Sequence, residues 1–231
     1  MASQFLSALL VTAAFAALAY VLGMVSRGGA LGGFVVGSLI YASLGPQGFA
    51  VLALFVVGGS LLTRLGYRSK QRAGTAQESG GRRGAKNALA NCAVAVLCAA
   101  LATLTGDPSF TAAFVASLGA AFADTAESEF GQIYGRTPSL VTTFRRVRPG
   151  TDGAVSLPGT LAGVAAATVT AALGLVVGLV GDPGEMLLVG LAAFVGTGAD
   201  SLIGALTPRA GNELTNLLCT LTAATLVVLL V

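Results

Sequence analysis

Long apolar runs, interrupted by glycine and by short polar stretches, dominate the chain. No charged residue occurs from Phe5 to Val25 or from Gly28 to Thr63. Uncharged apolar runs of this length are typical of membrane-spanning segments. The pattern predicts an all-α fold, a polytopic membrane bundle of about eight short, glycine-rich helices in a single integral membrane domain over residues 1–231. The expected segments are residues 5–25, 30–44, 48–63, 88–105, 109–124, 157–180, 186–205 and 214–231.

Two features of this pattern leave alternatives open. The first run has the length of a secretory signal, but no cation precedes it, so a retained membrane helix is favoured. Segments 30–44 and 48–63 are joined by the turn signal Gly45-Pro46. A helix of about 15 residues is only about 23 Å long, short of a hydrocarbon core about 30 Å thick. These two segments are therefore expected either to cross the membrane or to form a re-entrant pair.

The charged residues are few and lie in alternate loops. Apolar residues make up 55% of the chain and charged residues 10%, with no His and no Trp, which excludes an ordinary water-soluble domain. The 13 cations are Arg27, the seven from Arg64 to Lys86, the four from Arg136 to Arg148, and Arg209. By the positive-inside rule these loops are expected to face the cytoplasm, with both termini outside.

Acidic residues and paired asparagines gather at the expected cytoplasmic level. Asp124, Glu127 and Ser128 share a helical face by their spacing, and carboxylates at helix ends are costly in a membrane unless they are used. Asp152 and Asp200 fall at the same level. Asn87 with Asn91, and Asn212 with Asn216, are spaced four apart, either to cap and join helices or to bind a ligand. The Asn match is compatible with a parallel two-fold repeat.

These groups together predict a site for a metal-bound polyphosphate. Carboxylates that form an incomplete cage suit Mg²⁺ shared with phosphates, and Lys86, Arg146 and Arg148 are candidates for neutralising phosphate charge. The same cations are also explained by membrane topology alone. The glycine-flanked Thr151-Asp152 segment allows backbone N–H groups to approach an anion. No GxxxxGK[ST] sequence occurs, which excludes a P-loop kinase.

Four ordered motifs give the chain a resemblance to a known family. They are Ala123–Gly131, Gly150–Leu157 followed by Gly159–Gly163, Ala199–Ala205, and Asn212 with Asn216. The chain resembles a widespread integral-membrane family, long of unknown function, whose plant and cyanobacterial members are phytyl-phosphate kinases. The resemblance implies phosphoryl transfer from a nucleoside triphosphate to a prenyl monophosphate such as phytyl or geranylgeranyl phosphate. The product would be the prenyl diphosphate used in tocopherol, quinone or related lipid synthesis.

The resemblance also implies which residues form the site. Asp124, Glu129 and Asp200 would hold Mg²⁺, with Asp152 as a further catalytic carboxylate. Periodicity favours Glu127 beside Asp124, whereas the family pattern favours Glu129, which requires the helix end to unwind. By their place in the family pattern, substrate and nucleotide binding is assigned to Asn91, Thr125, Ser128, Ser201, Asn212 and Asn216. The local pattern of charge and polarity adds Lys86, Asn87, Arg146, Arg148 and Thr151 to this set.

The expected partners are the nucleoside triphosphate, the prenyl monophosphate and membrane lipids, with no nucleic acid. A transporter or lipid-translocating bundle is the rival from another class, because repeats and buried carboxylates are natural there too. A prenol kinase or a lipid cytidylyltransferase differs only in the acceptor or in the phosphorus attacked.

Overall fold

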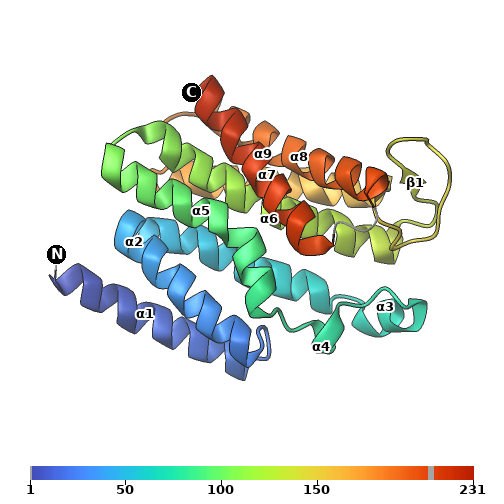
Figure 1. Cartoon of the computed structure of the whole chain (residues 1–231), viewed down its shortest axis with the longest axis horizontal. Helices are drawn as coiled ribbons and strands as arrows, with labels where there is room; N and C mark the ends of the chain where they lie inside the picture. Colours follow the sequence, from blue (N-terminus) through green and yellow to red (C-terminus); the bar gives the residue numbers. More distant parts are fainter. Residues whose placement is uncertain (1, 208–210) are drawn as a thin grey trace.

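The prediction of an all-α polytopic membrane bundle is confirmed by the structure, a computed structural model that describes residues 2–207 and 211–231 (Figure 1). Within these residues, six helices are long and apolar enough to cross a bilayer, and a seventh has the shorter apolar run Phe5–Val21. The helices are α1 (Ala2–Val21), α2 (Arg27–Arg64), α3 (Tyr67–Ala73), α4 (Glu78–Gly81), α5 (Ala85–Thr105), α6 (Pro108–Tyr134), α7 (Leu157–Val176), α8 (Pro183–Leu206) and α9 (Asn212–Leu230). A two-stranded antiparallel hairpin, β1 (Ser139–Leu140) with β2 (Ala154–Val155), lies in the loop before α7.

Helix α2 folds back on itself at Gly45. This residue has φ 66° and ψ −161°, a conformation in the left-handed half of φ space that glycine adopts without strain, and Pro46 follows it. A Cβ placed on Gly37 would lie 3.2 Å from the ring of Phe49. In a straight helix these two positions would be about 18 Å apart. Residues 27–44 and 46–64 are therefore two adjacent legs of a helical hairpin (Figure 1).

The two legs are longer than the sequence pattern predicts. The first begins at Arg27 because the side chain of Ser26 caps it by accepting a hydrogen bond from the Gly29 N–H. It runs beside α5: Gly28 lies next to Ala85 in the first turn of α5, and Thr103, near the end of α5, donates to the Ser43 carbonyl over 3.2 Å. The two alternatives were full crossings and a re-entrant pair. Because the first leg extends along most of α5, the structure favours two legs that cross the membrane.

Helix α6 lies at the centre of the bundle. It packs against α2, α5, α7, α8 and α9. In its most apolar stretch of 18 residues, 78% of the residues are buried, whereas the corresponding share is 28% to 44% in the other five long helices. Its sequence between Ala112 and Ala126 consists mostly of alanine, glycine and other small residues, which let helices approach closely in lipid. Large side chains such as Leu161 of α7 and Val195 of α8 are exposed on the outside. The centre of the bundle is therefore built on small residues.

The basic loops meet at one end of the bundle, called here the polar end (Figure 1). Val25 pairs with Arg83, Thr75 packs on Gly150, and Gly153 packs on Ala205, so the loops before α2, α5, α7 and α9 are neighbours. The linker before α5 forms the short helices α3 and α4, which the apolar pattern does not indicate. Arg209 lies outside the described residues. Whether the polar end faces the cytoplasm stays a prediction.

Candidate functional site

A cavity of about 740 Å³, called here the polar chamber, opens at the polar end. Its wall comes from α5, α6, α8 and α9 and from loop residues 74–77 and 149–154. Most of the predicted site residues line it: Asn87, Asn91, Asp124, Thr125, Ser128, Glu129, Thr151, Asp152, Asp200, Ser201, Asn212 and Asn216. Residues far apart in the sequence are thus brought to one cavity of a size that holds small ligands.

Three carboxylates of α6, those of Asp124, Glu127 and Glu129, line the chamber from a continuous helix. The segment expected at 109–124 is too short, because α6 stays helical as far as Tyr134. The expectation that the helix unwinds is therefore wrong, and the i, i+3 relation keeps Asp124 and Glu127 on one face. The Thr160 hydroxyl of α7 donates to Glu127 Oε1 over 3.2 Å. Glu127 departs from the family pattern, yet it lines the chamber beside Asp124.

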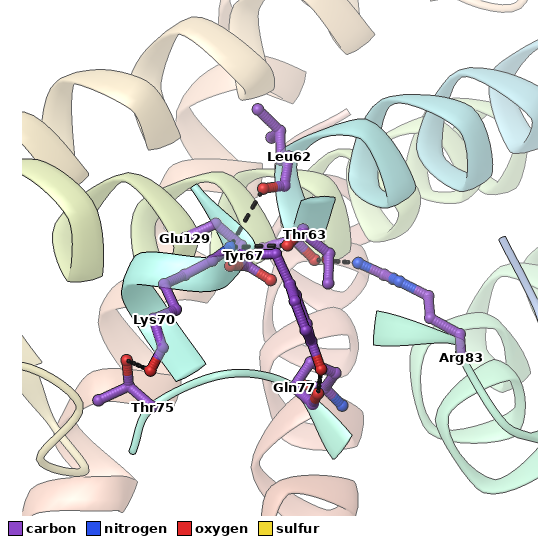
Figure 2. Close-up of polar contacts among 9 residues, drawn as sticks. Leu62, Thr63, Tyr67, Lys70, Thr75, Gln77, Arg83 and Glu129 are labelled. Carbon is purple, nitrogen blue, oxygen red and sulfur yellow. Dashed lines mark hydrogen bonds and ion pairs between the residues drawn. The ribbon is translucent and has the colours of Figure 1, made fainter. Parts of the chain in front are cut away.

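Glu129 also lines the chamber, but its carboxylate is already paired. It forms an ion pair with Lys70 of α3, and the Lys70 side chain is only 1% exposed (Figure 2). The ammonium also donates to the Thr63 carbonyl over 2.7 Å and to the Leu62 carbonyl over 3.4 Å. A carboxylate held by a buried ammonium is a poor metal ligand, so the geometry favours Glu127 over the predicted Glu129. Lys70 itself is indistinguishable by sequence from the other cations of a basic linker.

Asp200 brings a carboxylate of α8 into the chamber. It lies six residues, or about 9 Å, before the end of the helix. Its Oδ1 is buried and accepts no hydrogen bond from the described residues, and the same holds for Asn87 Oδ1 of α5. Buried acceptors without a partner are rare in proteins. Two of them at one cavity are suited to a ligand that carries a cation or hydrogen-bond donors.

The asparagine pairs line the chamber and do not cap their helices. The N-cap residues are Gly84 for α5 and Gly211 for α9, and neither helix has a side-chain cap. Asn91 Nδ2 donates to the Asn87 carbonyl over 2.9 Å, within the same helix. Capping is therefore excluded as the reason for these residues, and their side chains are available to a ligand.

Asp152 is held beside α8 by its loop. Gly153 packs against Ser201 and Ala205, leaving no room for a side chain at that position. The Thr151 hydroxyl donates to the Arg148 carbonyl over 2.8 Å. The loop thus places Asp152 in the wall near Asp200.

The predicted phosphate-neutralising cations lie elsewhere. Lys86, Arg146 and Arg148 are exposed and do not line the chamber, because Lys86 points outward on α5 and the arginines follow the outer side of the hairpin loop. This part of the prediction is not supported by the geometry.

Arg83 supplies the cation at the wall instead. Its Nη2 donates to the Thr125 hydroxyl over 3.1 Å, and its guanidinium carbon lies 5.0 Å from the ring centre of Phe55. Gly59 leaves the space for this guanidinium. Burial lowers the pKa of Arg83, while the Glu129 and Asp124 carboxylates act in the opposite direction; the group stays charged at neutral pH. Seven cations crowd this linker, so only the fold distinguishes Arg83.

The wall fits a divalent cation that is shared with phosphates. Among the described residues, no three His, Cys, Asp or Glu side chains are close enough to hold a metal by themselves. Asp124 and Glu127 of α6 and Asp200 of α8 nevertheless line the same chamber. Mg²⁺ characteristically takes one or two carboxylates and completes its shell with water and substrate phosphates. Asp124, Asp200 and Glu127 are the residues that would hold it.

Comparison with known proteins identifies relatives in several lineages. The profile of the family described as "Integral membrane protein DUF92" matches residues 10–224. An uncharacterized membrane protein of Synechocystis sp. is 39% identical over 79% of this chain and 72% of its own length. Protein VTE6, chloroplastic, of Arabidopsis thaliana is 35% identical over 78% of this chain and 55% of its own length. An uncharacterized membrane protein of Methanocaldococcus jannaschii is 35% identical over 87% of this chain and 84% of its own length. No solved structure is significantly similar.

Proposed function

The chain belongs to the integral membrane protein family DUF92, and from this membership and the polar chamber we propose that it is a membrane-embedded prenyl-phosphate kinase. It transfers a phosphoryl group from a nucleoside triphosphate to a prenyl monophosphate and releases the prenyl diphosphate. Plant and cyanobacterial relatives are among its matches, in line with the resemblance drawn from the four motifs.

One observation carries the proposal. Carboxylates from α6 and α8 converge on a chamber at one end of a membrane bundle, together with unpartnered acceptors on Asp200 and Asn87 and a fixed cation, Arg83. Phosphoryl transfer depends mainly on positioning and on neutralising charge. A chamber that combines these groups at the edge of an apolar bundle suits a water-soluble triphosphate and a lipid monophosphate at once.

The residues of the chain take the following roles. Asp124, Asp200 and Glu127 would hold Mg²⁺, which would supply charge neutralisation at the nucleotide phosphates. Asn212 and Asn216 offer amide groups to the nucleotide from α9, and Asn87 and Asn91 do so from α5. Arg83, which bonds Thr125 next to Asp124, neutralises phosphate oxygens. The predicted ligand Glu129 acts indirectly, through its pair with Lys70.

The chemistry balances without an acid or base from the protein. An oxygen of the acceptor phosphate bonds to the γ-phosphorus while the bond from that phosphorus to the β–γ bridging oxygen breaks. The nucleoside diphosphate leaves with that oxygen and its electron pair. The acceptor is already an anion at neutral pH, so no general base is required, and the absence of His is no obstacle.

A transfer assay with purified protein tests the proposal. The protein is incubated with Mg²⁺, a γ-³²P-labelled nucleoside triphosphate, and either geranylgeranyl monophosphate or geranylgeraniol. Labelled geranylgeranyl diphosphate formed from the monophosphate alone is the expected result. Label transferred to the alcohol would identify a prenol kinase. Release of pyrophosphate would identify a cytidylyltransferase. No transfer to either acceptor would exclude the kinase.

A further inference from the structure

A narrow apolar groove between α1, α2 and α5 reaches the polar chamber. Its wall includes Phe15 of α1, Gly33 and Val36 on the first leg of α2, and Phe49 and Phe55 on the second. It contains about 50 Å³, against about 740 Å³ for the chamber. From Gly29 to Val36 it follows α2 for about 10 Å into the bundle. The groove is small and apolar, and Arg83 and Asn87 supply the charged and amide side chains of its wall.

Two residues belong to both spaces. Arg83 and Asn87 line the chamber and also the groove. Arg83 rests on the Phe55 ring at the groove while its Nη2 bonds Thr125 at the chamber. A cation thus marks the junction between an apolar groove and a polar cavity, a pattern of charge that is complementary to an anionic head on a hydrocarbon tail.

We propose that this groove binds the first part of the isoprenoid tail of the acceptor, with the acceptor phosphate at Arg83 and facing the chamber. The inference rests on the proposed function and specifies where its lipid substrate lies. Burial of apolar tail surface and pairing of the phosphate with a guanidinium both favour this orientation. The tail then leaves the groove toward lipid, while its phosphate faces the nucleotide.

Gly33 offers a way to block the groove. A Cβ placed there would meet no atom of the described residues within 4 Å, so a Gly33→Phe side chain starts in open space at the groove wall. Gly198 of α8 is the matched control, because it too has open space around it, is exposed, and lies outside both cavities. Each substitution places one aromatic ring on a helical glycine.

The test is photolabelling of the full-length protein in lipid nanodiscs. The probe is geranylgeranyl monophosphate with a diazirine in the isoprene unit nearest the phosphate. We expect the probe to label groove-facing residues of α1, α2 and α5. An excess of unmodified geranylgeranyl monophosphate should displace the probe, and phosphatidic acid should not. Gly33→Phe should reduce groove labelling at least tenfold, and Gly198→Phe should leave it unchanged.

Failure of the groove proposal and failure of the proposed kinase function give different results in this experiment. Labelling spread over lipid-facing residues such as Leu31 and Leu161, or equal displacement by phosphatidic acid, would overturn the proposal. The wild-type label map decides this point even if Gly33→Phe fails to fold. Because labelling needs no phosphoryl transfer, groove labelling without transfer would refute only the kinase, and transfer without groove labelling would refute only the groove.

Discussion

At the scale of single residues, two neighbouring glutamates on α6 have different surroundings. Glu127 faces the chamber and accepts from Thr160, whereas Glu129 is bound by buried Lys70. The family pattern and helical periodicity disagree about which of them is a metal ligand, and the continuous helix favours Glu127. The two residues therefore form a natural pair of test sites.

Glu127→Gln should impair catalysis, and Glu129→Gln should mainly impair stability. Loss of a group that neutralises charge near the reacting phosphates typically costs about a hundredfold in rate. We expect a fall of this size in kcat/KM for Glu127→Gln, with a raised Mg²⁺ requirement and an unchanged melting temperature. Assays over a range of Mg²⁺ concentrations, with thermal melting of both variants, check this. A raised Mg²⁺ requirement in Glu129→Gln alone would restore the original assignment.

At the scale of elements, helix α3 is attached to the bundle by one buried ion pair. Lys70 reaches Glu129 and two carbonyls at the end of α2 (Figure 2). The following loop is tied down by bonds from the Thr75 hydroxyl to the Lys70 carbonyl and from the Tyr67 hydroxyl to the Gln77 carbonyl. Residues 74–77 of this loop cover part of the chamber. The pair therefore couples local stability to the shape of the site.

Removing one partner of this pair should destabilise the protein more than removing both. Breaking a buried pair costs about 3 kcal/mol, since a charge is left buried, whereas an apolar replacement of both partners is often neutral. We expect Lys70→Met to lower the melting temperature clearly and Lys70→Met with Glu129→Leu to recover most of the loss. Melting curves in detergent measure both. Equal melting of the single variant and the wild type would contradict a buried pair.

Local signals indicated most elements, and long-range packing decided the rest. The apolar runs gave the long helices, and Gly45-Pro46 gave the hairpin of α2, because both signals are local. The apolar pattern does not indicate the extension of α6 to Tyr134, since Ser128, Glu129 and Gln132 make its last turns partly polar and line the chamber. Helix α3 was missed because Lys70 gains its partner, Glu129, from 59 positions away.

The same division holds for the site. Asp124 and Asp200 were identified because acids in apolar helices are rare, and they do line one chamber. Arg83 could not be separated from Lys86, Arg146 and Arg148, because every cation in a basic loop looks alike until the fold buries one. An acidic residue in an apolar helix can thus be identified as a site residue from the sequence. Which of several similar cations lies at the site can be identified only from the fold.

At the scale of the whole molecule, the two ends differ in charge. The cations described by the structure cluster at the polar end, whereas the other end has the helix caps Asp107 and Asp182. The positive-inside rule then predicts that the chamber faces the cytoplasm.

Cysteine labelling of a cysteine-free variant tests this orientation. Cys92, Cys98 and Cys219 are replaced by alanine, and a single cysteine is introduced as Arg146→Cys at the polar end or Thr105→Cys at the other end. Both positions are exposed. An impermeant maleimide added to intact cells should label Thr105→Cys alone. Labelling of Arg146→Cys alone would place the chamber outside.

We expect Asp124 of α6 and Asp200 of α8 to share one metal ion when a nucleotide is bound. A double-mutant cycle measures this directly: binding of a non-hydrolysable Mg²⁺–nucleotide is titrated into wild type, Asp124→Asn, Asp200→Asn and the double variant. Groups that share a ligand are coupled, by 0.5–3 kcal/mol in general, so we expect about 1 kcal/mol or more here. Strictly additive losses, or full affinity in either single variant, would contradict the account.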